Sequence, residues 1–220
     1  MHNLNVLQQI AVWAIPILFA VTLHEVAHGW VARLLGDRTA QMLGRLSLNP
    51  LKHIDPMGTV VIPLVLALSS VGVIFGWAKP VPITMQNLRH PKRDMAFVAV
   101  AGPLSNLLMA FIWVIILKLA LLFGDQASAT VIFISYVCFA GITINLLLLV
   151  INLIPIPPLD GSRVVSALLP GPLEWKYNQL EGYGLFIFFG LMLLLNYTGH
   201  IIYLIQFLDW LKLLLLNLVF

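Results

Sequence analysis

The sequence predicts an all-α polytopic membrane protein with about five to six transmembrane helices and a small membrane-associated β element. Hydrophobic residues make up 60% of the 220 positions, and charged residues make up only 10%. The mean hydropathy is +0.98, which soluble globular domains do not reach. A helix needs about 20 apolar residues to cross a bilayer, and several stretches approach that length. This composition excludes a soluble globular protein.

The predicted spans form one membrane domain over residues 1–220. Because residues 1–9 carry no Lys or Arg, we expect the first apolar stretch to be retained rather than cleaved as a signal peptide. The main core is expected at about 8–170, followed by a C-terminal helical hairpin at about 183–220. The predicted spans lie near residues 8–35, 95–123, 130–153, 183–197 and 200–219.

A sixth apolar stretch, 57–77, has two interpretations. Lys and Arg concentrate in cytoplasmic loops, and basic residues flank this stretch on both sides, so a full crossing would place one flank on the wrong side. A re-entrant hairpin removes the conflict, while an ordinary span stays an alternative. With the hairpin, the charge rule places the N-terminus outside and the C-terminus in the cytoplasm of a cell-membrane protein. The basic residues form short clusters, which do not indicate nucleic-acid binding.

Residues 39–48 show the alternation of an amphipathic strand. Met42, Gly44, Leu46 and Leu48 alternate with polar residues, a period of two that is typical of β structure. A second extended piece is expected at 79–83, where two prolines exclude a helix. The first segment either holds an unwound substrate by β-augmentation or caps the site.

The segment His24 to His28 matches the pattern H-E-x-x-H. On a helix this spacing places two imidazoles on one face with a carboxylate beside them, which suits two zinc ligands and one base. Ionisable groups in an apolar span cost about 2.5–3.5 kcal/mol each on insertion scales. A role that compensates this cost is therefore expected, whereas polar packing between helices is the bland alternative.

A catalytic zinc site needs a third protein ligand from elsewhere in the fold. The single cysteine, Cys138, lies in an apolar run and offers no cysteine-based site. Asp160 is the best candidate among the nine acidic residues, because three prolines end the preceding apolar helix and place this carboxylate on rigid backbone. A solvated helix-end Asp is the alternative. His53 and His90 lie in basic loops without partners at ligand spacing, so we expect them to be solvated loop histidines.

Three ordered motifs resemble the site-2 protease family of intramembrane zinc metalloproteases, in a compact form without PDZ or CBS domains. The H-E-x-x-H element falls on residues 24–28, an N-x-x-P-x-x-x-x-D-G element falls on 152–161, and a G-P-x-x-N element falls on 102–106. The resemblance covers roughly residues 8–170. It implies a zinc ion bound by His24, His28 and Asp160, with Glu25 as the catalytic carboxylate.

The predicted function is zinc-dependent endopeptidase action on membrane-embedded or membrane-proximal proteins. Glu25 would take a proton from water acidified by the metal and pass it to the leaving amine. Asn106 and Asn152 are amides on apolar helices, and each either donates to the oxyanion or substrate backbone or joins helices. A mobile 57–77 segment is predicted to gate substrate entry. A catalytically silent client-binding protein and a metal or solute transporter are the alternatives, and the oligomeric state is left open.

Overall fold

The described part of the chain is built from helices. A computed structural model describes residues 4–61, 65 and 78–220. Within these residues no strand is present, and five segments are long and apolar enough to cross a membrane, which confirms the predicted spans and makes the chain a multi-pass membrane protein. The helices are α1 (Val6–Leu34), α2 (Thr39–Met42), α4 (Pro91–Phe123), α5 (Ala129–Asn152), α6 (Asp160–Leu168), α7 (Gly171–Asn178), α8 (Gly184–Tyr197) and α9 (Ile201–Val219).

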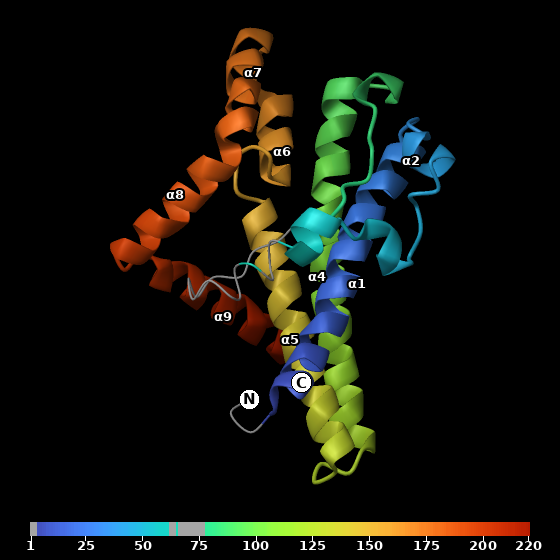
Figure 1. The fold of residues 1–220 in the computed structure, drawn as a ribbon, viewed down its shortest axis with the longest axis vertical. Coiled ribbons are helices and arrows are strands. Elements are labelled where there is room, and N and C mark those ends of the chain that lie inside the picture. Colours follow the sequence, from blue (N-terminus) through green and yellow to red (C-terminus); the bar gives the residue numbers. More distant parts are fainter. Residues whose placement is uncertain (1–3, 62–64, 66–77) are drawn as a thin grey trace.

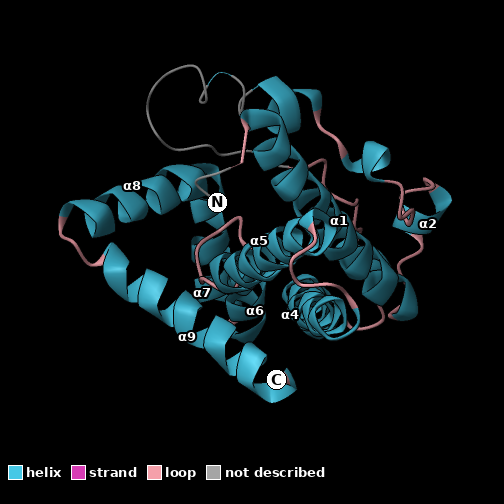
Figure 2. Ribbon diagram, turned by 90° about the horizontal axis from the view of Figure 1, so that it is seen from below, coloured by secondary structure: helices cyan, strands magenta, loops and turns pink. Residues whose placement is uncertain are grey.

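Helices α1, α4 and α5 pack together along their lengths and form the centre of the molecule (Figures 1 and 2). Their facing sides carry small and branched residues at helical spacing, among them Ala110 and Val114 of α4 and Ile142 and Leu146 of α5. A Cβ added to Gly141 would lie 2.5 Å from the ring of Trp113. The absent side chain at this position therefore lets α4 and α5 approach closely, as small residues do between membrane helices.

The loop after α1 is fixed by a buried carboxylate. Asp37 is only 1% exposed, and it accepts hydrogen bonds from Thr39 N (2.9 Å), Thr84 N (2.7 Å) and Asn87 Nδ2 (3.1 Å). Burial by itself would raise the pKa of Asp37, but these hydrogen bonds outweigh it and hold that pKa below its ordinary value. The contacts fasten residues 84–87 to the end of α1.

The predicted strand at 39–48 is wrong. Thr39–Met42 forms the short helix α2, and Gly44 follows in the left-handed region with φ of 63°. The backbone N–H groups of Met42 and Leu43 bond to Arg38 O and Thr39 O, so this turn satisfies them locally and needs no partner strand. Met42 and Leu48 are exposed, so the alternation does not mark a buried face. Residues 79–83 also lack regular secondary structure.

Most of the segment 57–77 lies outside the described residues, and with it the predicted hairpin and gate. Its flanks are described. Lys79 N donates to His53 O at 2.9 Å, so the chain returns to the place that it left. Arg45 Nη2 donates to Lys79 O at 2.9 Å, and Arg89 N donates to Leu35 O at 3.0 Å. The first two contacts join the flanks of 57–77 to each other, and the third places Arg89 beside the C-terminal end of α1. The re-entrant hairpin predicts flanks that lie together in this way.

Helices α8 and α9 follow one another across a short turn at residues 198–200. They splay apart from their connecting turn (Figures 1 and 2), and α9 packs against α4 and α5 instead. The 14 residues of α8 span only about 21 Å, which is less than the hydrocarbon thickness of about 30 Å. The segment Gly171–Tyr197 reaches the length of a span only because α7 and a 3₁₀ turn lead directly into α8.

Both ends of the described chain lie toward the α4–α5 turn. Lys118, near the end of α4, donates to Val219 O of α9. Leu4 and Phe133, which is near the start of α5, both pack against the same small cluster of buried residues from α1 and α5. This arrangement favours ends on the same side of the membrane over the predicted opposite sides, and a labelling experiment distinguishes the two.

Candidate metal centre

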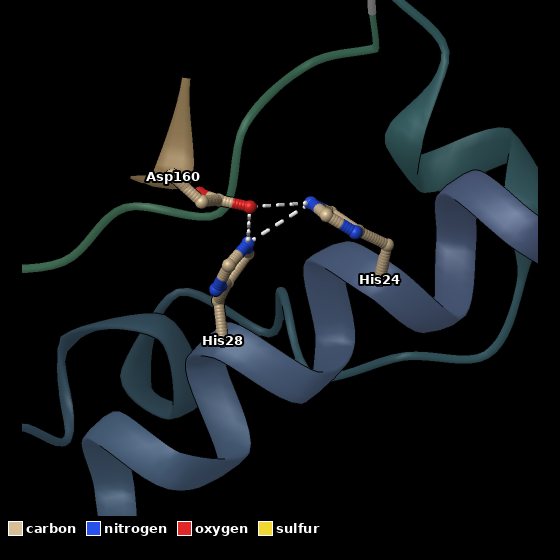
Figure 3. Close-up of side chains that lie close together, drawn as sticks. All are labelled: His24, His28 and Asp160. Atoms are coloured by element: carbon tan, nitrogen blue, oxygen red, sulfur yellow. Dashed lines mark hydrogen bonds and ion pairs between the residues drawn. The ribbon is translucent and has the colours of Figure 1, made fainter. Parts of the chain in front are cut away.

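Three ligand-type side chains from distant parts of the sequence meet beside α1. His24 and His28 lie one turn apart on α1, and Asp160 begins α6 and faces them (Figure 3). Asp160 Oδ2 lies 3.1 Å from His24 Nε2 and 3.3 Å from His28 Nε2, and the two Nε2 atoms are 3.0 Å apart. Both histidines are buried. The structure thus brings together the three residues that the sequence predicts as ligands.

The outer nitrogen of each histidine contacts helix α4. His28 Nδ1 lies 2.7 Å from Val98 O, and His24 Nδ1 lies 2.6 Å from Asn106 Oδ1. A carbonyl oxygen only accepts, so each Nδ1 carries the proton and donates it. Each Nε2 then presents a lone pair to the centre. Histidine ligands of metals are commonly held in this way.

The donor set fits a tetrahedral divalent metal. In a zinc site with bonds of about 2.0–2.1 Å, ligand atoms lie about 3.3–3.4 Å apart, close to the three separations found here. Asp160 Oδ2 is buried and accepts no hydrogen bond from the described residues. Two imidazole lone pairs and one carboxylate oxygen would repel each other at these distances, and a shared cation removes that repulsion. These three residues could therefore hold a metal ion together.

Gly102 makes the contact between α4 and the imidazoles possible. A Cβ added there would lie 2.4 Å from His28 Nε2 and 2.6 Å from His24 Cε1, which is too close for real carbon atoms. The glycine of the G-P-x-x-N element is therefore a space requirement of the centre. The motif alone does not reveal this role, because a glycine in a membrane helix more often serves helix packing.

The backbone around Asp160 is tightly folded. Leu159 O accepts from Ser162 Oγ at 2.6 Å and from Ser162 N at 3.0 Å. A Cβ added to Gly161 would lie 2.3 Å from Leu153 O. The loop after α5 thus packs against the start of α6, which in turn packs against α4. This packing fixes the carboxylate opposite the histidines.

Glu25 stands beside the centre without belonging to its ligand set. Its Oε2 accepts a hydrogen bond from Val81 N at 2.8 Å. Proline has no N–H, so Val81 carries the only backbone donor in the run Pro80 to Pro82. That donor orients the carboxylate. Sequence patterns contain no signal for this contact, because the two residues are 56 positions apart.

Asn106 does not have the geometry of an oxyanion donor. It is fully buried, and its Nδ2 donates to Asn145 Oδ1 at 3.0 Å and to Ala20 O at 3.3 Å. Its oxygen accepts from His24, so the amide lies behind the histidine with its polar atoms occupied. Asn152 donates to Leu148 O of its own helix at 3.0 Å, and no described contact joins it to the centre.

The two loop histidines lie outside the described metal cluster. His53 is buried, and its Nε2 bonds to Ser47 O at 2.9 Å, so the prediction of a solvated side chain is wrong for this residue. His90 is exposed and donates its backbone N–H to Asp94 Oδ2 at 2.8 Å, just before α4. Both residues stabilise local turns.

Comparison with known proteins agrees with this geometry. Residues 118–195 match the model of Peptidase family M50. Three similar proteins carry names that begin "Putative zinc metalloprotease". YwhC of Bacillus subtilis is 39% identical over 175 residues, which are 79% of this chain and 76% of that protein. Rip2 of Mycolicibacterium smegmatis is 37% identical over 145 residues, 66% of this chain and 52% of that protein.

MJ0611 of Methanocaldococcus jannaschii is 33% identical over 94 residues, which cover 42% of this chain and 44% of that protein. The chain thus spans about half the length of Rip2 and MJ0611 and about three quarters of YwhC. No solved structure matches the chain. Similarity of this extent to YwhC, with the three motifs and the family match, shows that the chain belongs to peptidase family M50, the family of the site-2 proteases.

Proposed function

We propose that the chain is a zinc-dependent endopeptidase that hydrolyses peptide bonds of membrane-embedded or membrane-proximal proteins. The observation that carries this proposal is the convergence of His24 Nε2, His28 Nε2 and Asp160 Oδ2, with Glu25 next to His24 on α1. Three protein ligands and an adjacent carboxylate are the composition of a catalytic zinc site rather than a structural one.

The three ligand residues would hold the zinc ion and leave a fourth position open. When bound, zinc supplies a Lewis acid that polarises the scissile carbonyl and acidifies water. The N-terminal turn of α6 supports the Asp160 carboxylate, because a helix N-terminus favours negative charge. The α4 contacts at Nδ1 keep both Nε2 lone pairs directed at the ion.

Glu25 acts as the base and then as the acid. Its carboxylate accepts a proton from the attacking water and transfers that proton to the amine that leaves when the C–N bond breaks. The Val81 N–H bond holds Oε2 in place during both transfers. Glu25 is half-buried, and a partly desolvated carboxylate of fixed orientation is an effective base.

The depth of the centre supports the substrate class. His24 lies ten residues before Leu34, the last residue of α1, and this separation corresponds to about 15 Å along the helix. If the end of α1 lies at the bilayer surface, the centre is below that surface, where membrane-embedded segments are the available peptide chains. A substrate helix must unwind locally before hydrolysis, because its peptide bonds are hydrogen-bonded within the helix.

A cleavage assay with detergent-purified protein and a panel of single-span substrates tests the proposal. We expect cleavage by the wild-type chain, loss of cleavage with a chelator and recovery after zinc is added. The matched control is Glu25→Gln, which removes the base but no ligand. We expect it to keep its zinc and to lose at least about 100-fold in turnover.

Two results would contradict the proposal. Cleavage that persists in chelator would exclude the metal mechanism. A zinc-loaded wild-type chain that binds panel members but leaves them intact would favour the silent client-binding alternative.

A further inference from the structure

Asn145 is a fully buried amide in the middle of α5, and the proposed mechanism assigns it no role. Its side chain is 0% exposed and lies in a helix with mean hydropathy of 2.3 over its most apolar window. Polar groups at such positions are costly and are often functional. Asn145 contacts neither a ligand residue nor Glu25, so any effect on the centre must pass through another side chain.

The hydrogen bonds of Asn145 have a fixed direction. Its Nδ2 donates to Gly141 O at 2.8 Å, and a backbone carbonyl accepts but cannot donate. The opposite orientation of the amide would place two oxygens against each other. Oδ1 of Asn145 therefore faces Asn106 and accepts from its Nδ2 at 3.0 Å.

This direction continues to the metal centre. Because Nδ2 of Asn106 faces Asn145, Oδ1 of Asn106 faces His24 Nδ1 at 2.6 Å. His24 then holds its proton on Nδ1 and presents the Nε2 lone pair toward Asp160. The other acceptor for Asn106 Nδ2 is Ala20 O at 3.3 Å, which is the longer and weaker of the two contacts.

We propose that Asn145 is a positioning residue for the metal centre, fixing Asn106 so that His24 offers its Nε2 lone pair to the ion. The inference rests on the proposed zinc site and deepens it. Helix α5 then serves the centre through Asn145 in its middle, and helix α6 serves it through Asp160 at its start. Outer partners of ligating histidines typically change metal affinity by about 10–100-fold when removed.

A purely structural role for Asn145 predicts a different ranking of its Leu and Asp variants by zinc affinity. If the amide only joined α4 to α5, Asn145→Leu would lower stability but leave zinc affinity unchanged, and Asn145→Asp would be the more damaging change because it buries a charge. If Asn145 positions Asn106, the order reverses for metal binding. Asp keeps an oxygen that accepts from Asn106, whereas Leu offers none.

Competition between the purified protein and a zinc chelator measures this order directly. We expect Asn145→Leu to lower zinc affinity about 10–100-fold and Asn145→Asp to remain closer to the wild type. Ile142→Ala is the matched control, since Ile142 is fully buried in the same helix and packs in the α4–α5 core. We expect it to lower thermal stability while zinc affinity stays within about threefold of the wild type, a smaller change than outer-partner loss produces.

A double-variant cycle with Asn106→Leu decides the case even if Asn145→Asp does not fold. If Asn145 acts through Asn106, adding Asn145→Leu to Asn106→Leu causes no further loss of affinity. Additive losses, or wild-type affinity in Asn145→Leu, would overturn the inference. A wild-type chain that binds no zinc would instead contradict the proposed function itself, and that result is visible without any variant.

Discussion

At the scale of single residues, the metal centre needs a position without a side chain next to the imidazoles as much as it needs the ligand residues. Gly102 lies against both imidazoles, and a methyl group there would overlap His28 Nε2 and His24 Cε1. The protein interior is close-packed, and α4 is held next to α1 by the Val98 and Asn106 contacts with the two histidines. An added Cβ must therefore displace the imidazoles themselves.

We predict that Gly102→Ala lowers zinc affinity by about 10-fold or more, an effect comparable to the loss of an outer partner. Gly190→Ala is the control, because a Cβ there meets no heavy atom within 4 Å and a helix gains stability from the exchange. Chelator competition measures both variants. Equal zinc affinity in the two would show that the backbone can move aside and that Gly102 has no such role.

The ligand residues could be predicted from the sequence, whereas their outer partners could not. H-E-x-x-H sets the two histidines by its spacing, and the prolines before Asp160 single out that carboxylate. For Asn106 the sequence leaves an oxyanion donor and a helix-joining amide both open, because an amide on an apolar helix looks the same in sequence whether it faces substrate or a histidine. Only the position of α4 relative to α1 distinguishes the two roles. The same packing reveals that Asn145 lies behind Asn106.

At the scale of elements, the loop between α1 and α4 is organised by Asp37 rather than by a strand. The alternation at 39–48 suggested β structure, but a strand needs a partner for its backbone groups. Here, Asp37 accepts hydrogen bonds from Thr39 N, at the first residue of α2, and from Thr84 N. The second bond holds the segment that contains Val81 next to the end of α1. The contact between Val81 N and Glu25 therefore depends on an element that local sequence patterns do not show.

We predict that Asp37→Asn lowers the free energy of unfolding by about 1–3 kcal/mol at neutral pH, since it disrupts a buried, charge-assisted hydrogen-bond network. The folded pKa of Asp37 is below its ordinary value of 3.8. The carboxylate therefore stabilises the fold above that pH, and the contribution is lost as pH falls through the folded pKa.

Thermal unfolding in detergent across pH tests this prediction. The difference in stability between the wild type and Asp37→Asn should be constant near neutral pH and should become smaller below about pH 4. Asp125→Asn is the control, because Asp125 is exposed in the α4–α5 turn, and we expect a change within about 0.5 kcal/mol. A gap that widens in acid would contradict the assigned role.

At the scale of the whole molecule, the path of α8 and α9 determines where the chain ends. Their apolar composition predicts two spans, although 183–197 is already short for a span in the sequence, and the 14 residues of α8 are too few to cross alone. Leu215 and its neighbours on α9 pack against α4 and α5, which directs the last helix toward the α4–α5 turn. The three central helices follow from sequence because each is long and continuously apolar.

We predict that the first and last residues face the same side of the membrane and that Arg89 faces the other. Epitopes appended at the two ends should be equally accessible to antibodies in sealed vesicles. Arg89 is exposed, so a cysteine at position 89 should react with a membrane-impermeant reagent only in vesicles in which the two epitopes are inaccessible. The native Cys138 is buried, so it should not contribute to the labelling. Opposite accessibility of the two ends would show that α8 and α9 each cross.

The most direct test of the account is the zinc content of the purified chain, measured as zinc per polypeptide after exhaustive dialysis. Asp160 is far from the histidines in sequence, and its meeting with them is what turns a two-histidine helix into a metal centre. We predict one zinc per chain in the wild type and in Glu25→Gln, and a loss of most of it in Asp160→Ala. Full zinc content in Asp160→Ala would contradict the proposed centre.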